Sequence, residues 1–354
     1  MKAVVCRGPG EYVVEDVDEP RAAAGEAVLA VEAVGICASD VKCFQGAPMF
    51  WGDATRPPYV EPPVTPGHEF TGRIAAIDGA AADRWQVATG DRVVVEQIVP
   101  CGECRYCAGG SYWMCQRNDI FGFHRAVQGA MAEFIRIPPG ARVHKISAEL
   151  PAAHAAFAEP LSCALHAVDR ADIGDGDTVV IAGLGPIGLG MVAGARARRP
   201  GQVVCVDADP RRLEVARACG ADITVNLADG DPVQTVLDLT DGYGCDVYLD
   251  ATGHPSGVTQ GLAMLRKLGC FVEYSVMREP VTVDWTIIGD SKELDIRGAH
   301  LGPRCWPRAI AMIEDGRVPL ERIVTHQIPV QDVEEGLRLV ARGRESIKVV
   351  LTSF

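Results

Sequence analysis

The sequence predicts an α/β protein of two parts, a barrel-like, β-rich part and a doubly wound parallel sheet. Residues 1–155 hold short β-branched runs separated by prolines and glycines, without a long amphipathic helix. From about residue 160 to 295, strand-like and helix-like segments alternate, which is typical of βαβ units in a parallel sheet. The pattern changes near residue 156, so we expect the two parts to meet there.

The end of the chain returns to mixed character. Two helix-like stretches each end at a glycine, and a last strand-like run, IKVVLTS, follows. We therefore expect one domain made of residues 1–157 and 297–354, with the parallel-sheet domain, residues 158–296, inserted between its two pieces. A cysteine-rich lobe is expected at 95–118, inside the first domain.

Four cysteines indicate a metal site in that lobe. They form the run C-x2-C-x2-C-x7-C, at Cys101, Cys104, Cys107 and Cys115. Thiolates are soft ligands, and four of them on one short lobe can close a tetrahedral shell around Zn²⁺. Two disulfides, or unrelated buried cysteines, are the competing interpretations. Because a closed shell leaves no position for a substrate, we expect this zinc to be structural.

The overall composition is that of a globular protein and excludes several functions. The 354 residues are 48% hydrophobic and 23% charged, with a net charge of −13. An acidic chain without a Lys/Arg-rich run opposes binding to nucleic acids and anionic membranes. No apolar stretch approaches the roughly 18 residues of a membrane helix. The N-terminus does not resemble a signal peptide, so thirteen cysteines indicate a reducing cytoplasm.

A glycine motif opens the second part. Strand-like residues 178–182 lead into G-L-G-P-I-G, and a small-residue helix follows. In this strand–turn–helix context the motif predicts a dinucleotide site on a Rossmann-type sheet. The helix N-terminus offers free N–H groups to the pyrophosphate. The expected contacts come from the motif itself, Gly183, Gly185, Pro186, Ile187 and Gly188.

The next strand-like run favours one of the two nicotinamide cofactors. It ends at Asp207, 19 residues after Gly188. A carboxylate at this place accepts hydrogen bonds from both ribose hydroxyls and repels a 2′-phosphate. The sequence therefore predicts NAD rather than NADP.

Three further segments carry metal-ligand residue types: GICASD at 35–40, PGHEF at 66–70 and AEPLSC at 158–163. With the cysteine lobe and the nucleotide motif, in this order along the whole chain, they resemble the zinc-dependent medium-chain dehydrogenases. The most similar branch is that of the polyol (sorbitol-type) dehydrogenases, which carry GIC-x-SD, GHE and EPLS-x-x-x-HA. Four segments look most like bacterial erythritol/L-threitol dehydrogenases, at 48–53, 156–163, 281–288 and 298–303.

The resemblance implies a second, catalytic zinc on Cys37 and His68. In alcohol dehydrogenases of the family a cysteine occupies the position of Glu159, and in polyol relatives that glutamate holds the zinc or its water. Successive strand residues point to opposite faces, so Glu69 can share a metal with His68 only across an irregular turn. We rank Glu159 first and Glu69 as a supporting or exchanging carboxylate. Three protein ligands leave one position open.

The resemblance also implies how protons move at this site. Zinc acts as a Lewis acid on the substrate alcohol, and Ser39 resembles the family hydroxyl that relays its proton. Asp40 resembles the carboxylate that orients a ligating histidine. Relatives often carry a relay histidine where this chain has Lys42, so water is an alternative route for the proton.

The substrate pocket is the least specific part of the prediction. The long aromatic insert at 44–65 is interpreted equally well as a surface loop, a subunit contact or a pocket wall. Arg212 resembles the arginine that packs on the adenosine ribose. The candidate pocket residues are Phe44, Trp51, Phe121 and His300.

These observations predict an enzyme that oxidises a secondary alcohol of a small polyol, with a C4 tetritol favoured, to the ketose. Its expected cofactors are NAD and two Zn²⁺ per chain, and its expected assembly is a homotetramer or homodimer. A zinc alcohol or threonine dehydrogenase on the same fold is the alternative enzyme. A non-catalytic binding or structural protein is the alternative of another class, which the presence of Cys37, His68 and Glu159 disfavours.

Overall fold

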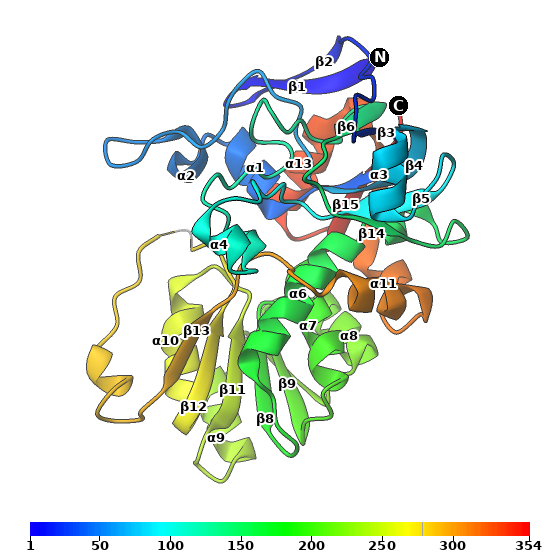
Figure 1. Ribbon diagram of the computed structural model, residues 1–354. Coiled ribbons are helices and arrows are strands. Elements are labelled where there is room, and N and C mark those ends of the chain that lie inside the picture. Colours follow the sequence, from blue (N-terminus) through cyan, green and yellow to red (C-terminus); the bar gives the residue numbers. More distant parts are fainter. Residues whose placement is uncertain (278) are drawn as a thin grey trace. The chain divides into compact units, whose positions relative to one another are not determined.

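The computed structural model of the chain describes residues 1–277 and 279–354. It divides into two compact units, and both chain ends belong to the first (Figure 1). The first unit comprises Met1–Glu159, Trp306–Glu314 and Val324–Phe354. The second comprises Pro160–Cys305 and Asp315–Ile323.

The first unit is built on a seven-stranded sheet in the order β14-β15-β3-β4-β5-β7, with β6 also paired to β3. The central strand β3 pairs antiparallel with β4, β6 and β15. A separate hairpin joins β1 to β2. The strands are β1 (Lys2–Gly8), β2 (Glu11–Asp16), β3 (Ala27–Gly35), β4 (Glu69–Ile77), β5 (Arg92–Val95), β6 (Phe134–Ile137), β7 (Val143–Lys145), β14 (Val324–Pro329) and β15 (Lys348–Thr352).

Only short helices interrupt these strands before α6, which agrees with the β-rich character expected of this part. A continuous apolar core lies inside the unit and includes side chains of β3, β4, β5 and β15. The helices are α1 (Ala38–Phe44), α2 (Pro48–Trp51), α3 (Gly79–Trp85), α4 (Arg105–Ala108), η1 (Tyr112–Met114), α5 (Ala152–Ala155), α11 (Trp306–Glu314), η3 (Val330–Asp332) and α13 (Val333–Arg342). The first turn of α6 (Ala158–Ala171) crosses the boundary between the units.

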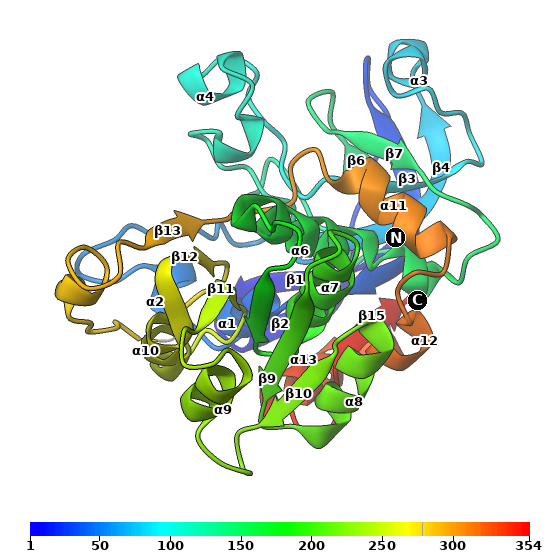
Figure 2. The ribbon, with the colours of Figure 1, turned by 90° about the horizontal axis from the view of Figure 1, so that it is seen from below.

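The second unit is a six-stranded sheet in the order β10-β9-β8-β11-β12-β13. Every neighbouring pair in it is parallel, so the predicted doubly wound sheet is confirmed. The pair α7 and α8 lies on one face and the pair α9 and α10 on the other (Figure 2). The strands are β8 (Thr178–Ala182), β9 (Gln202–Asp207), β10 (Ile223–Asn226), β11 (Cys245–Asp250), β12 (Leu265–Glu273) and β13 (Asp295–Gly298).

The helices of the second unit begin and end where local chemistry dictates. Asp209 and Asp231 cap α8 and α9 by accepting a backbone N–H two residues ahead, and Gly220 ends α8 in the left-handed conformation. The remaining helices are α7 (Pro186–Arg196), α8 (Pro210–Cys219), α9 (Pro232–Leu239), α10 (Pro255–Met264), η2 (Trp285–Ile287) and α12 (Leu320–Ile323). Within the described residues, no helix is long and apolar enough to cross a membrane.

Candidate metal centres and nucleotide site

The four-cysteine lobe brings its sulfurs together within one short segment. The four Sγ atoms lie within 4.8 Å of one another, and the Sγ atoms of Cys101 and Cys107 are 3.9 Å apart. A tetrahedron with Zn–S bonds of about 2.3 Å has S–S edges of about 3.8 Å. All four cysteines are free thiols, so the donor set fits a closed zinc shell and the structure contains no disulfide here.

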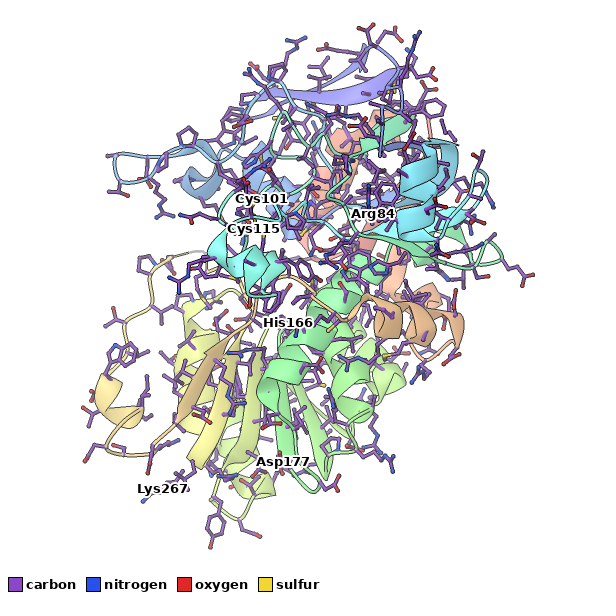
Figure 3. The ribbon with its side chains drawn as sticks, in the orientation of Figure 1. Arg84, Cys101, Cys115, His166, Asp177 and Lys267 are labelled. Carbon is purple, nitrogen blue, oxygen red and sulfur yellow. The ribbon has the colours of Figure 1, made fainter. Side chains whose placement is uncertain are left out.

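Backbone N–H groups donate hydrogen bonds to the same sulfurs, which stabilises thiolates that can bind a cation. The N–H of Cys101 donates to the Sγ of Cys115, and the N–H of Cys104 donates to the Sγ of Cys101, each at 3.3 Å. Cys101 and Cys115 are labelled next to each other in Figure 3. Hydrogen bonds from the backbone of Gln116 and Cys107 lower the pKa of Cys104 to about 6. Thiolate is the ligand form of cysteine, so the loop favours the state that binds Zn²⁺.

A second cluster assembles from segments that are distant in sequence. One ligand atom each of Cys37, His68 and Glu69 lies within 4.8 Å of the others. Cys37 is the N-cap of α1, while His68 comes just before β4 and Glu69 is its first residue. Gly67 supplies the required irregular turn, because its φ is +99° and a Cβ there would lie 2.9 Å from Val34. His68 and Glu69 therefore do approach a common point.

Asp40 is not a member of this cluster but lies beside two of its members, Cys37 and His68. One of its oxygens accepts the N–H of Cys37 at 2.8 Å, and the other lies 3.7 Å from Nδ1 of His68. Burial alone would lower the pKa of His68, but the negative charges of Asp40, Cys37 and Glu159 raise it to about 10. The site thus holds an excess of negative potential that a divalent cation would neutralise.

Among the residues that the structure describes, three buried polar atoms at this site have no hydrogen-bond partner: Oγ of Ser39, Oδ1 of Asp40 and Nδ1 of His68. Buried polar atoms are nearly always satisfied, and those that are not need a specific explanation. The donor set of sulfur, imidazole and carboxylate is one that zinc uses in catalytic sites. The residues present therefore fit a bound zinc with Ser39 beside it.

Glu69 has a buried cationic partner that sequence reasoning missed. Nζ of Lys348, in β15, donates to Oε2 of Glu69 and, at 2.9 Å, to the carbonyl of Ile36. The Lys348 residue is only 2% exposed. Gly35 makes room for the pair, since a Cβ there would meet Glu69 at 2.2 Å. A single lysine within the apolar run of β15 was the available signal.

Glu159 is not part of the Cys37–His68–Glu69 cluster, but it lies near it. It stands in the first turn of α6 and is 6% exposed. Its Oε1 accepts a 2.6 Å hydrogen bond from the side-chain amide of Gln97. Its charge contributes to raising the pKa of His68. Both carboxylates that the sequence proposed as the third ligand are thus buried near His68.

The glycine motif has the geometry that a dinucleotide turn needs. Gly183 has a φ of +85°, and a Cβ there would lie 2.7 Å from the backbone of Ala251. A Cβ at Gly188 would overlap the carbonyl of Gly183 at 1.8 Å, whereas at Gly185 nothing lies within 4 Å. Pro186 and Ile187 open α7, so the open side of the turn faces the start of a helix.

Asp207 ends β9 and holds this turn in place. Its Oδ2 accepts the N–H of Leu184 at 2.6 Å, and its Oδ1 accepts the N–H of Asp209 at 2.8 Å. Arg212 lies one turn into α8, with its Nε 3.9 Å from Asp209. The structure therefore brings Asp207 to the glycine turn, as a ribose-binding carboxylate requires.

The four pocket candidates have different surroundings. Phe44 packs edge-on against Tyr12 at 5.0 Å, and Trp51 donates its indole N–H to the carbonyl of Cys43. Phe121 is fully buried against Phe70. His300 follows β13 in the second unit, where burial lowers its pKa. Their role in binding substrate stays a prediction.

A different aromatic residue, which sequence reasoning missed, contacts the metal cluster. The Phe123 ring lies 5.6 Å from that of His68 and stacks on Phe50 of α2 at 5.1 Å. Tyr59 closes the group at 5.6 Å from Phe123. Part of the 44–65 insert is therefore folded onto the ring beside His68, and its aromatic composition was the available signal.

Comparison with known proteins gives the same assignment for both units. Residues 23–148 match the alcohol dehydrogenase GroES-like domain, and residues 186–315 match the zinc-binding dehydrogenase domain. The chain is 58% identical to an erythritol/L-threitol dehydrogenase of Mycolicibacterium smegmatis over 351 residues, 99% of this chain and 97% of that protein.

More distant relatives are also dehydrogenases. An L-threonine 3-dehydrogenase of Bacillus subtilis is 33% identical over 97% of this chain and 96% of its own. A zinc-binding dehydrogenase of Sinorhizobium meliloti 1021, solved with NADP bound, has a TM-score of 0.88 at 28% identity over 99% of this chain and 98% of its own. The expected fold, a barrel-like catalytic domain with a Rossmann-type sheet, is confirmed. The chain is an oxidoreductase and belongs to the zinc-binding, medium-chain alcohol dehydrogenases.

Proposed function

We propose that this enzyme oxidises a secondary alcohol of a small polyol, a C4 tetritol such as erythritol or threitol, to the ketose with NAD as hydride acceptor. The observation that carries the substrate class is the 58% identity to an erythritol/L-threitol dehydrogenase over nearly the whole of both chains. The buried sulfur–imidazole–carboxylate cluster supports the reaction type.

The proposal includes two zinc ions with different roles. Cys101, Cys104, Cys107 and Cys115 would hold one in a closed shell. Cys37 and His68 would hold the other with a carboxylate as third ligand, and we retain Glu159 ahead of Glu69. The salt bridge to Lys348 already neutralises Glu69, which supports that order, whereas the proximity of Glu69 to Cys37 and His68 opposes it.

At the catalytic site, bound zinc supplies a Lewis acid for the substrate hydroxyl and NAD accepts the hydride. The residues of this chain do the rest. Asp40 accepts the N–H of Cys37, and the charge of its other oxygen, 3.7 Å from Nδ1 of His68, would favour one orientation of that ring. The buried Oγ of Ser39, without a partner among the described residues, would relay the proton that the substrate hydroxyl loses, accepting it while its own hydroxyl proton passes on to water. The Phe123 ring lies against His68 and would shield the reacting atoms from water.

We infer NAD rather than NADP from the place of Asp207 at the glycine turn. The 2′-phosphate of NADP would lie beside the carboxylate of Asp207, and these two negative charges would repel each other. Arg212 would pack on the adenosine ribose. The related structure with NADP bound makes this choice a direct experimental question.

The remaining parts of the proposal concern organisation. We propose a catalytic domain of residues 1–157 and 297–354 and a nucleotide domain of residues 158–296, in a homotetramer or homodimer. We also propose a cytoplasmic location, because all thirteen cysteines are free thiols. Analytical ultracentrifugation of the purified protein measures the oligomer.

One assay tests the proposed reaction. NADH appearance should be followed over C3 to C6 polyols, including erythritol, both threitols, xylitol and sorbitol, with L-threonine and simple secondary alcohols as comparison substrates. We expect the highest kcat/KM on a tetritol. A higher kcat/KM on L-threonine would assign the alternative enzyme, which the 33% identical relative represents.

A further inference from the structure

Gln97 is a buried amide that contacts one of the two candidate metal carboxylates. It follows β5, is 1% exposed, and donates from Nε2 to Oε1 of Glu159 at 2.6 Å. We propose that Gln97 is a positioning residue of the catalytic metal centre, which holds Glu159 in one orientation toward the metal. This inference rests on the proposed function in one respect, that Glu159 faces the catalytic zinc.

The two carboxylates accept hydrogen bonds from different donors. Lys348 donates to Glu69 and gives it a cation within salt-bridge distance. The uncharged amide of Gln97 donates to one oxygen of Glu159, and Lys348 acts on Glu159 through its charge. A neutral donor stabilises a buried carboxylate while leaving its negative charge available to a metal ion. Ligating carboxylates are typically held by such outer hydrogen bonds.

The backbone around Gln97 fixes where the amide can reach. The N–H of Glu96 donates to the carbonyl of Arg142, and the carbonyl of Gln97 accepts the N–H of Phe121, both at 2.9 Å. Gln97 lies in a bend after β5, and these hydrogen bonds hold the backbone on both sides of it, which limits the positions that its side chain can reach. The donor is therefore preorganised before a metal arrives.

Glu96 provides an internal contrast. It is also buried, but its carboxylate contacts a different group, accepting from the hydroxyl of Tyr112 at 2.9 Å and lying 3.0 Å from Nε2 of His144. Tyr112 lies in the cysteine lobe. Adjacent residues thus contact the two metal sites separately, one the lobe and the other Glu159, which gives a matched control.

The test measures zinc release, which does not depend on any substrate. Zinc-loaded protein is mixed with an excess of chelator, and the two release phases are assigned with Cys104→Ser, which removes the structural site. Gln97→Met keeps the length of the side chain but removes the donor. We expect it to speed release of the catalytic zinc roughly tenfold or more. Glu159→Ala and Glu159→Ala/Gln97→Met are loaded from excess Zn²⁺ immediately before mixing with chelator, since both hold the catalytic zinc weakly. In this background Gln97→Met should add no further acceleration, because its partner is gone.

Tyr112→Phe is the matched control, since it removes the hydrogen bond to Glu96 and leaves Gln97 in place. It should release the catalytic zinc at the wild-type rate. If Gln97→Met does not fold, Gln97→Leu serves in the same assay. It also lacks the amide donor, so the same acceleration of catalytic zinc release is expected.

The proposal is overturned by a wild-type release rate in Gln97→Met, by equal acceleration with and without Glu159, or by a wild-type rate in Glu159→Ala. Thermal unfolding of each variant shows that the fold is retained. If the protein oxidises none of the polyols but Gln97→Met speeds zinc release only when Glu159 is present, the substrate class is refuted and the positioning role of Gln97 is supported. If the protein oxidises a tetritol but Gln97→Met does not show this dependence on Glu159, the substrate class is supported and the role of Gln97 is refuted.

Discussion

The two candidate metal sites of the first unit are built in opposite ways. All four ligands of the cysteine lobe fall between residues 101 and 115, and backbone N–H groups of the same loop donate to their sulfurs. The candidate catalytic cluster joins the N-cap of α1, the start of β4 and β15, with contacts that span as many as 312 residues. A local site depends on its loop, whereas a dispersed site depends on the whole fold. Substitutions in the two should therefore fail differently.

The largest expected effect comes from Cys37→Ser, in the dispersed site. Losing a thiolate ligand should lower kcat/KM at least roughly a thousandfold, or about 4 kcal/mol of transition-state stabilisation. Because Cys37 is the N-cap of α1 and serine is also a favourable N-cap residue, the unfolding temperature should change little. Steady-state kinetics and a thermal melt on the same preparation check both parts. Retained activity would remove Cys37 from the ligand set.

The second largest effect should distinguish the two candidate third ligands, Glu159 and Glu69. We expect Glu159→Ala to lose zinc and most of its activity, while Glu69→Ala keeps zinc and loses part of the rate, roughly ten- to a hundredfold. Metal analysis and polyol oxidation are measured on both variants in parallel. If only Glu69→Ala loses the catalytic zinc, the ranking is reversed. Loss in both would indicate that the carboxylates exchange during turnover.

The local site should show the opposite pattern. Cys104→Ser removes one ligand of a closed shell and should lower the free energy of unfolding by roughly 3 kcal/mol or more, together with one zinc per chain. The remaining activity per correctly folded molecule should stay near that of the wild type. A zinc content of two in active Cys104→Ser protein would contradict the assignment of this site.

A smaller effect is expected in the second unit, where the nucleotide site is also local. The wild type should prefer NAD over NADP at least roughly tenfold in kcat/KM, about 1.4 kcal/mol. Asp207→Ser should narrow this gap and also loosen the glycine turn, since Asp207 accepts the N–H of Leu184. Equal use of both cofactors by the wild type would show that Asp207 does not discriminate.

The smallest expected effect tests a dispersed contact in the second unit. Glu273 and Asp250 end neighbouring parallel strands. Burial and the charge of Asp250 raise the pKa of Glu273 from 4.5 to about 8. Between these values the folded chain keeps a proton that the unfolded chain has released, so stability falls as the pH rises. Glu273→Gln should raise the melting temperature by a few degrees more at pH 9 than at pH 5. Equal shifts at both values would exclude a retained proton.

The sequence by itself determined the features that depend on local spacing. The positions of Cys101 to Cys115 predicted a zinc lobe, and the glycine motif with its flanking strand and helix predicted a Rossmann-type sheet, which the strand order confirms. Short loops and βαβ units have few ways to fold, so residue type and spacing specify their geometry. The ordered motifs at 35–40, 66–70 and 158–163 resemble those of the zinc-dependent medium-chain dehydrogenases, and this resemblance predicted the family.

Only the tertiary structure decided which residues support the catalytic cluster. Lys348 pairs with Glu69 across 279 residues, and Gln97 with Glu159 across 62. The contact of Phe123 with His68 is equally absent from any local pattern. Strand periodicity predicts which side chains point inward but not which of them meet. These contacts depend on sheet order and register. They place the Lys348 cation beside Glu69 and the Gln97 amide beside Glu159.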